Sequence, residues 1–338
     1  MTVRVGVIGA GMIGQTHVQR ITETVPGGRV VAVADVDTAR AAQVAAGVPG
    51  ARVHQRGQDL IADGGVDAVL VTSWPATHEE YVLAAIAAGK PVFCEKPLAP
   101  AADGAMRIVE AEMAAGRRLV QVGFMRRYDP GYRALKEALD AGHAGAPLLM
   151  HCAHRNPAPP AGFTTESVIC DSAVHEVDVA RWLFGEEIAA TTVLRPRRTA
   201  RAPGGLQDPL VVLLEMASGI LVDVELFVTA GYGYDIRAEV VGEAGALELA
   251  DTGGLTVTRQ GRRGGRVPAN WAERFGRAFD AEFTDWLWAA AAGTAAGPAA
   301  WDGYAAALVT DRCLRALHTG SRAAVAVPER PDFYTKPR

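Results

Sequence analysis

The stretch "VRVGVIGAGMIG", residues 3–14, decides the fold of the first part of the chain. A run of β-favouring residues ends in three glycines, Gly9, Gly11 and Gly14, and a helical pattern follows. In such a unit the first glycine allows a tight turn, the second admits a pyrophosphate, and the third lets the helix pack closely on the strand. Asp35 ends the next apolar run about 20 residues later, where a carboxylate can accept hydrogen bonds from a ribose. The spacing predicts a dinucleotide site.

Asp35 also indicates which dinucleotide binds. Its negative charge would repel a 2′-phosphate, and the residues that follow it, "VDTAR", place no arginine immediately beside it. We therefore expect NAD rather than NADP as the cofactor. A glycine-rich turn without a nucleotide, or a site for FAD or a sugar nucleotide, is a less favoured interpretation.

The first 125 residues alternate between short apolar runs and helical patterns. Nearly continuous apolar runs are typical of parallel strands that are covered on both faces. One helical segment, "ATHEEYVLAAIAAG", carries a possible capping box of Thr77 with Glu80 and closes on Gly89. The alternation predicts a doubly wound α/β domain of the Rossmann type. We expect its strands at residues 3–9, 29–35, 66–73, 91–96 and 118–124.

The pattern changes after about residue 125. A helix at 129–142 and a strand at 147–156 precede successive β-runs separated by the turn signals "ASG", "GEAG" and "DTGG". We expect these further strands at 190–195, 209–217, 220–228, 235–242, 246–250 and 255–259, and final helices at about 270–291 and 299–318. The sequence thus predicts a Rossmann domain at 1–125 and an α+β domain at 126–338 with a large, mostly antiparallel open sheet. The last helix and tail could pack back on the first domain.

Composition narrows the class of protein. The chain has 338 residues, of which 49% are hydrophobic and 21% are charged, and a formal charge of −4. This charge does not favour binding to nucleic acid or to an anionic membrane. The four cysteines contain no CxxC pair and are expected to be reduced thiols. With no leader or membrane-spanning run, we expect a soluble, cytoplasmic protein.

A second stretch, "ICDSAVHEVD", residues 169–178, places Asp171, His175 and Asp178 at spacings of four and three. On an α-helix they would form one polar stripe within about 40°. Such a stripe could be part of a metal site, a proton relay, or only the polar side of a helix. No second helical histidine has the spacing of a zinc motif, so no metal is expected.

Lys96 is a third candidate, in "VFCEKPLAP" at the end of the predicted 91–96 strand. Ligands of open α/β sheets gather outside the carboxyl ends of the strands. Lys96 therefore lies where a nicotinamide ring would meet a substrate, or it is only a surface lysine at the end of a strand.

The three stretches together resemble the Gfo/Idh/MocA oxidoreductases, and within that family the inositol dehydrogenases of bacteria. The resemblance covers essentially the whole chain. "EKP" and "H-x-x-D" mark the wider family, whereas "FMRRYD", "HCAHRNP" and "GYGYDI" are similar to the inositol-specific members. The resemblance implies that Lys96, Asp171 and His175 form the catalytic group. The chemistry supports this, because oxidation of a secondary alcohol requires a base and histidine has a near-neutral pKa suited to this role. His175 could take the proton, Asp171 could orient the imidazole, and Lys96 could hydrogen-bond the reacting oxygen. The resemblance also implies a homotetramer assembled through exposed sheet faces.

The expected binding residues complete the site. For the cofactor they are Gly9, Gly11, Met12, Ile13, Gly14, Asp35, Ser73, Trp74, His78, Glu95 and Lys96. For the substrate, by resemblance, they are Lys96, Met125, Arg126, His154, Asn156, Asp171, His175 and Tyr234. Each could instead be an ordinary packing or surface residue, and Asp178 could support the site or only solvate its helix.

The expected reaction is NAD-dependent oxidation of the axial hydroxyl of myo-inositol to 2-keto-myo-inositol, with His175 as the general base. The same chemistry on scyllo-inositol or an amino-inositol is the nearest alternative. An amine would require a further acid, for which Glu166 is a candidate. The chain could also act on a linear sugar, or it could be a non-catalytic regulator that binds NAD.

Overall fold

A computed structural model describes residues 2–250 and 257–335. Contacts divide the chain into two compact units. Unit 1 comprises Met1–Phe124, Phe279–Ala307 and Glu329–Arg338, and unit 2 comprises Met125–Ala278 and Leu308–Pro328. The chain therefore passes from unit 1 to unit 2 two times, and each time it returns to unit 1.

Unit 1 is built around a six-stranded parallel sheet. Its strands have the order β3-β2-β1-β4-β5-β6, so the direction of winding reverses between β1 and β4. In open sheets of this kind the ligand crevice lies outside the carboxyl ends of the strands at this switch point. The elements are β1 (Val3–Ile8), α1 (Met12–Glu23), β2 (Gly28–Ala34), α2 (Thr38–Ala46), β3 (Arg52–His54), α3 (Gly57–Ala62), β4 (Ala68–Val71), α4 (Pro75–Ala87), β5 (Val92–Cys94), α5 (Ala102–Ala114) and β6 (Val120–Val122).

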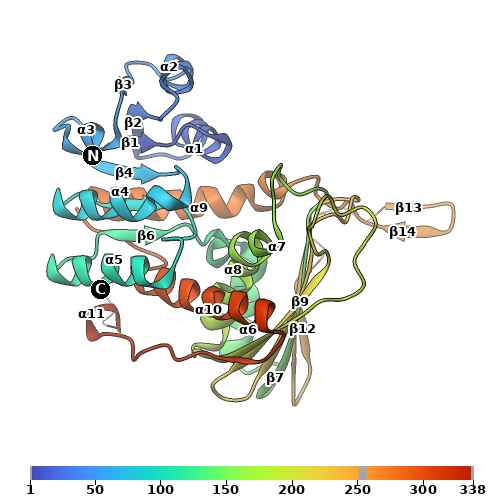
Figure 1. The fold of residues 1–338 in the computed structure, drawn as a ribbon. Helices are drawn as coiled ribbons and strands as arrows, with labels where there is room; N and C mark the ends of the chain where they lie inside the picture. Colours follow the sequence, from blue (N-terminus) through green and yellow to red (C-terminus); the bar gives the residue numbers. More distant parts are fainter. Residues whose placement is uncertain (1, 251–256, 336–338) are drawn as a thin grey trace. The chain divides into compact units, whose positions relative to one another are not determined.

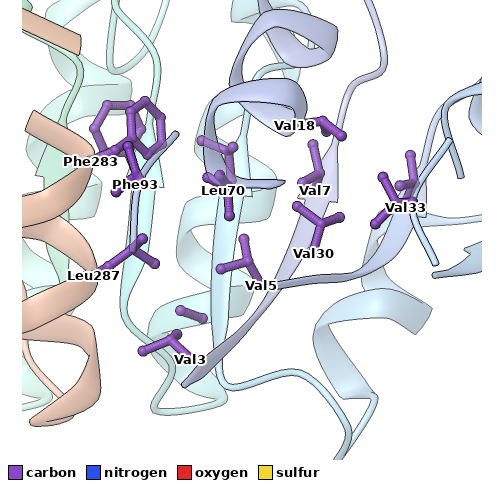
Figure 2. Close-up of a cluster of buried hydrophobic side chains, with 14 of the residues drawn as sticks. Val3, Val5, Val7, Val18, Val30, Val33, Leu70, Phe93, Phe283 and Leu287 are labelled. Atoms are coloured by element: carbon purple, nitrogen blue, oxygen red, sulfur yellow. The ribbon is translucent and has the colours of Figure 1, made fainter. Parts of the chain in front are cut away.

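The strands β1, β2, β4, β5 and β6 are mostly buried on both faces, which confirms the prediction from their continuous apolar runs. Valines of β1 and β2 pack with Leu70 and Phe93, as Figure 2 shows. Phe283 and Leu287, from the later helix α9 (Trp271–Ala291), complete this cluster. The rings of Phe93 and Phe283 stack with centroids 4.7 Å apart. The sequence patterns do not predict β3, which is only three residues long and has two exposed residues, Arg52 and Val53.

The start of α4 differs from the prediction. Trp74 is the N-cap and Pro75 the first helical residue, so Thr77 lies inside the helix and the proposed capping box with Glu80 is wrong. Proline is pre-organised for the first helical position, and here it starts the helix one turn earlier. The predicted end is confirmed, since Gly89 has a left-handed φ of 66° just past the helix.

Unit 2 contains a seven-stranded sheet of order β12-β11-β7-β10-β9-β8-β15. The pairs are antiparallel except β7 with β10, which confirms a mostly antiparallel sheet. In β9 and β10 burial alternates residue by residue, so one face of the sheet is covered and the other is open. The strands are β7 (Pro147–Arg155), β8 (Ile188–Leu194), β9 (Leu210–Met216), β10 (Leu221–Phe227), β11 (Asp235–Gly242), β12 (Ala246–Glu248) and β15 (Ala323–Ala324).

Five helical elements lie between β6 and β8 in the sequence. The five are the 3-10 turn η1 (Met125–Tyr128), α6 (Pro130–Asp140), α7 (Thr165–Ser167), the π-turn η2 (Val168–Ala173) and α8 (Val174–Phe184). Two of them, η2 and α6, contact strands of this sheet. A hairpin of β13 (Val257–Arg259) and β14 (Arg262–Gly264) projects from this unit (Figure 1). The predicted turn "DTGG" and the first two residues of the predicted 255–259 strand lie outside the described residues.

The last three helices that the structure describes are two long ones and a short one. These are α9, α10 (Ala300–Thr319) and α11 (Asp332–Thr335). The bounds of α9 and α10 agree with the predicted helices to within one residue. Within the described part of the chain, no helix is both long and apolar enough to cross a membrane.

Candidate active site

The three glycines of unit 1 have the geometry that a dinucleotide turn requires. Gly9 has a φ of 102°, and a Cβ there would lie 2.4 Å from the backbone nitrogen of Ser73. A Cβ on Gly14 would lie 2.0 Å from the carbonyl oxygen of Gly9. Gly11, the N-cap of α1, instead faces open space. The turn, the open approach and the tight packing therefore fall on the three predicted positions.

A cavity of about 500 Å³ lies beside this turn. It contains five of the expected cofactor residues, Gly9, Gly11, Asp35, Ser73 and Trp74. Trp74 and Met12 are both strongly exposed. The other residues that line the cavity are Ile8, Ala34, Val36, Arg40, Gln55, Arg56, Gly57, Gln58, Thr72, Ala76, Thr77 and Tyr81. Its backbone cradle and single carboxylate fit a dinucleotide.

Asp35 is tied to the glycine turn. Its two carboxylate oxygens accept hydrogen bonds from the backbone of Ala10 at 2.6 Å and of Asp37 at 2.8 Å. Arg40 also approaches the carboxylate, at 3.7 Å. The sequence has no arginine directly after Asp35, but the turn into α2 places the side chain of Arg40 near the Asp35 carboxylate.

Lys96 lies just past the end of β5, between Glu95 and Pro97, and its peptide bond to Pro97 is cis. The Glu95 carboxylate is buried and lies 2.8 Å from Nε2 of His17. Burial by itself raises the pKa of Glu95, but the hydrogen bond with His17 and the charge of Lys96 bring it below its ordinary value. His78 is buried on α4 and contacts the carbonyl oxygens of Pro97 and Ser73.

In unit 2, Asp171 and His175 do not share one α-helix. Asp171 lies in the π-turn η2, whereas His175 is the second residue of α8. The prediction of a continuous α-helical stripe is therefore wrong. The i→i+5 bonds of a π-turn widen the helix and rotate Asp171 relative to His175. Such turns occur frequently at functional sites.

Asp178, whose role the sequence left open, is buried in an ion pair. Its carboxylate oxygens accept hydrogen bonds from both Arg127 Nε, at 2.9 Å, and Arg127 Nη2. This bidentate pair links α8 to η1. Among the described residues, no group of three His, Cys, Asp or Glu side chains could hold a metal ion.

Arg126 and His154, both expected substrate residues, meet at a buried carboxylate. Arg126 forms an ion pair with Glu176, and both side chains are at most 2% exposed. His154 Nδ1 lies 3.1 Å from Glu176 Oε1 and 3.2 Å from Arg126 Nη2. Burial by itself raises the pKa of Glu176, but the charges of Arg126 and His154 lower it to about 2.

The remaining expected substrate residues surround this cluster. The ring of Tyr234 meets His154 edge to face at 5.8 Å, and the rings of His154 and His175 are 6.3 Å apart. Met125 is buried in η1. The Oδ1 atom of Asn156 is buried and has no hydrogen-bond partner among the described residues. The structure thus brings together Arg126, His154, His175 and Tyr234 in unit 2.

Lys96 belongs to unit 1, and Asp171 and His175 belong to unit 2. Their action as one catalytic group stays a prediction. Glu166, the candidate acid for an amine substrate, is exposed and contacts His318 at 3.1 Å.

The sequence reading missed Glu176 and Arg40. Glu176 directly follows His175, but nothing in the local spacing showed that it faces Arg126, which is distant in sequence. The unusually complete burial of α8 hides polar residues on several faces of the helix. A charged residue in such a helix requires a buried partner. The presence of a charged residue in a buried helix is therefore the signal that predicts a partner for Glu176.

Comparison with known proteins shows the family of the chain. Residues 3–124 match the model of the oxidoreductase family with an NAD-binding Rossmann fold, and residues 132–248 match the GFO/IDH/MocA C-terminal domain. The chain is 53% identical to inositol 2-dehydrogenase 3 of Saccharopolyspora erythraea, over 99% of this chain and 98% of that one. It is 51% identical to inositol 2-dehydrogenase of Burkholderia cenocepacia, over 99% of both chains.

A solved structure is similar over the same length. It is myo-inositol dehydrogenase from Lactobacillus casei in complex with NAD(H) and myo-inositol. The two share 38% identity and a TM-score of 0.96, over 99% of this chain and 100% of that one. Family models that span both halves and relatives of more than 50% identity over nearly the full length lead to one conclusion: the chain belongs to the GFO/IDH/MocA oxidoreductase family.

Proposed function

We propose that this protein oxidises the axial hydroxyl of myo-inositol to 2-keto-myo-inositol and uses NAD as the acceptor. The observation that carries the proposal is the near-complete coverage by relatives named inositol 2-dehydrogenase, at 51–53% identity. The Lactobacillus casei structure, bound to NAD(H) and myo-inositol, supports the same substrate. The glycine turn, the carboxylate of Asp35 and the adjoining cavity provide the place for the cofactor.

NAD, when bound, supplies an acceptor for the hydride that leaves the carbinol carbon. The chain's own residues must then accept the hydroxyl proton and stabilise the negative charge on the oxygen. His175 takes the hydroxyl proton on its imidazole, and Asp171 orients that ring and stabilises the imidazolium. Lys96 donates a hydrogen bond to the oxygen as negative charge develops on it.

Recognition of the inositol ring requires donors and acceptors that match several hydroxyls. Arg126 and His154 supply such groups, held by Glu176, and Asn156 supplies a buried oxygen that has no partner among the described residues. Tyr234 and Met125 supply apolar surface beside them. A polyol lacking one of the matched hydroxyls would leave one of these groups unsatisfied, which costs binding energy.

We also propose that the chain assembles as a homotetramer and is located in the cytoplasm. The open face of the unit 2 sheet exposes Leu149 and Leu194, and it fits a second copy of the chain in a homotetramer. All four cysteines are free thiols, which is consistent with a cytoplasmic protein.

The test compares NADH formation by wild type and His175→Ala with myo-inositol, scyllo-inositol, a streptamine-type aminocyclitol and glucose. We expect turnover of myo-inositol with NAD, and its collapse in the variant. Turnover of only scyllo-inositol or the aminocyclitol would move the enzyme to another cyclitol. Binding of NADH without turnover of any polyol would contradict the proposal and favour a regulator.

A further inference from the structure

Lys96 lies between two residues that are each held by a buried histidine. His17, on α1, contacts the side chain of Glu95, and His78, on α4, contacts the backbone of Pro97. The side chains of both histidines are at most 1% exposed. Because β5 ends at Cys94, Lys96 and Pro97 lie beyond the strand and depend on other contacts for their position.

The hydrogen-bond direction on the Glu95 side can be assigned. Nη1 of Arg20 lies 3.4 Å from His17 Nδ1, and Arg20 is anchored in turn by Asp280 at 2.7 Å. Since a guanidinium only donates, Nδ1 is the accepting nitrogen, and Nε2 carries the hydrogen that it donates to Glu95 Oε1 at 2.8 Å. The other carboxylate oxygen, Oε2, accepts the backbone N–H of Lys96 at 3.2 Å.

The ring of His17 has little freedom to leave this position. The rings of Phe279 and Phe283 pack against it with centroids 5.3 Å and 4.5 Å away, and Phe93 meets it edge-on. Burial lowers the pKa of His17, which keeps the ring neutral and preserves the single donor on Nε2. The chain Asp280, Arg20, His17, Glu95 therefore ends on the backbone of Lys96.

The Pro97 side is held by a different ring nitrogen. His78 Nδ1 lies 2.7 Å from the carbonyl oxygen of Pro97, and Nε2 lies 3.0 Å from that of Ser73. Both neighbours can only accept, and burial lowers the pKa of His78, so the ring is neutral and has one N–H. We place this hydrogen on Nδ1, which makes the shorter contact, so that the carbonyl oxygen of Pro97 is its acceptor.

We propose that His17 and His78 are positioning residues that fix the backbone on the two sides of Lys96. This inference rests on the proposed function, in which the Lys96 ammonium hydrogen-bonds the reacting oxygen. The lysine side chain is long and flexible, so its productive placement depends on a rigid starting point. A misplacement of about 1 Å can cost about a hundredfold in rate.

Crossed amide substitutions test the two contacts separately. The amide nitrogen of glutamine can replace Nε2 of histidine, and that of asparagine can replace Nδ1. His17→Gln and His78→Asn therefore keep the donors toward Glu95 and Pro97, whereas His17→Asn and His78→Gln lose them. We expect kcat for myo-inositol to be between about tenfold and a hundredfold lower in His17→Asn than in His17→Gln, and in His78→Gln than in His78→Asn.

A second readout does not require any substrate. Competitive acetylation followed by mass spectrometry gives the reactivity of Lys96 relative to Lys90 and Lys136 in the same protein. We expect this ratio to change in His17→Asn and His78→Gln and to stay at the wild-type value in the other two variants. The NAD dissociation constant and the melting temperature are measured on every variant.

Glu112→Gln is the matched control. Glu112 is a buried carboxylate of the same unit, and it accepts the backbone N–H groups of Leu119 and Val120 at 2.6 Å and 2.7 Å. These groups lie at the amino end of β6, away from the carboxyl ends of the strands. This variant should lower the melting temperature without changing kcat or the Lys96 ratio.

The outcomes separate the two proposals. If wild type oxidises no polyol, the proposed function fails, and the acetylation pattern still decides the role of the histidines. If the four histidine variants behave alike in acetylation, or if their kcat values fall only in step with their melting temperatures, the positioning role is overturned.

Discussion

At the scale of single residues, the main finding is that Glu176 links Arg126 and His154 in one buried cluster. A buried guanidinium is costly unless a partner compensates its charge, and Glu176 is that partner. The sequence predicted the two substrate residues, by resemblance, but not the carboxylate that holds them. Local spacing reveals neighbours within a helix, whereas this contact joins residues that are distant in the chain.

Replacing Glu176 by glutamine should impair both stability and recognition. The change leaves Arg126 buried without a compensating charge, which costs roughly 3–5 kcal/mol in comparable pairs. We expect a higher KM for myo-inositol and an unchanged NAD dissociation constant, measured by steady-state kinetics and fluorescence titration. Glu187→Gln is the control, since its partner Arg181 is on the same helix but Glu187 does not contact the cluster. An unaltered KM would contradict the role of Glu176.

The depressed pKa of Glu176 predicts how stability depends on pH. The ordinary carboxyl value of 4.5 falls to about 2 in the folded protein, because of Arg126 and His154 and despite burial. A carboxyl with a lowered folded pKa stabilises the fold above its unfolded pKa and loses that contribution as the pH falls. Glu176 should therefore contribute a loss of unfolding free energy between about pH 4.5 and pH 2. Urea unfolding across this range should give a shallower decline for Glu176→Gln, and identical slopes would refute the assignment.

Asp35 and Arg40 together should set the choice of cofactor. Asp35→Ser removes a charge that opposes a 2′-phosphate and leaves Arg40 in the same cavity. We expect the KM for NAD to rise about tenfold, because one hydrogen bond to a charged group is lost, and we expect NADP turnover to appear. Adding Arg40→Gln should abolish that gain. Kinetics with both cofactors check the prediction, which is wrong if NADP use persists without Arg40.

At the scale of elements, periodicity predicted the long helices and the apolar strands, since these depend on patterns within one segment. Apart from the short strand β3, two failures occurred where one residue changes the local geometry. Pro75 starts α4 before the expected cap, and the π-turn η2 interrupts the expected helix at Asp171. A π-turn has no sequence signature that spacing rules detect, because the inserted residue is stabilised by packing elsewhere.

The short helix α11 should stabilise unit 1 without taking part in catalysis. The hydroxyl of Tyr334 donates to buried Glu112 at 2.6 Å. Tyr334→Phe leaves one carboxylate oxygen without this donor, which costs about 1–3 kcal/mol. We expect a lower melting temperature in calorimetry and a kcat for myo-inositol equal to that of wild type. A fall in kcat at temperatures well below melting would contradict this separation.

At the scale of the whole molecule, fold class and family could be read from the sequence because their markers are short and spaced along one strand or one turn. The return of residues 279–307 and 329–335 to unit 1 depends on contacts between distant segments, so the sequence offered it only as a possible packing of the last helix and tail on the first domain. Assembly lies at the same scale, and the family resemblance carries the expectation of a homotetramer.

The open sheet face gives assembly a direct test. Leu149 and Leu194 are 37% and 46% exposed. Placing a charge there, as in Leu194→Glu, should weaken an interface that buries this face. Light scattering after gel filtration should give four times the chain mass for wild type and a smaller species for the variant. A monomeric wild-type protein would exclude the tetramer.

In the proposed reaction, hydride leaves the axial carbon of myo-inositol and reaches NAD. This transfer can be followed with myo-inositol deuterated at that carbon and mass spectrometry of the reduced cofactor. We expect deuterium in the NADH formed by wild type and no transfer by His175→Ala. Unlabelled NADH from wild type would show that another carbon is oxidised, and the proposed reaction would then be wrong.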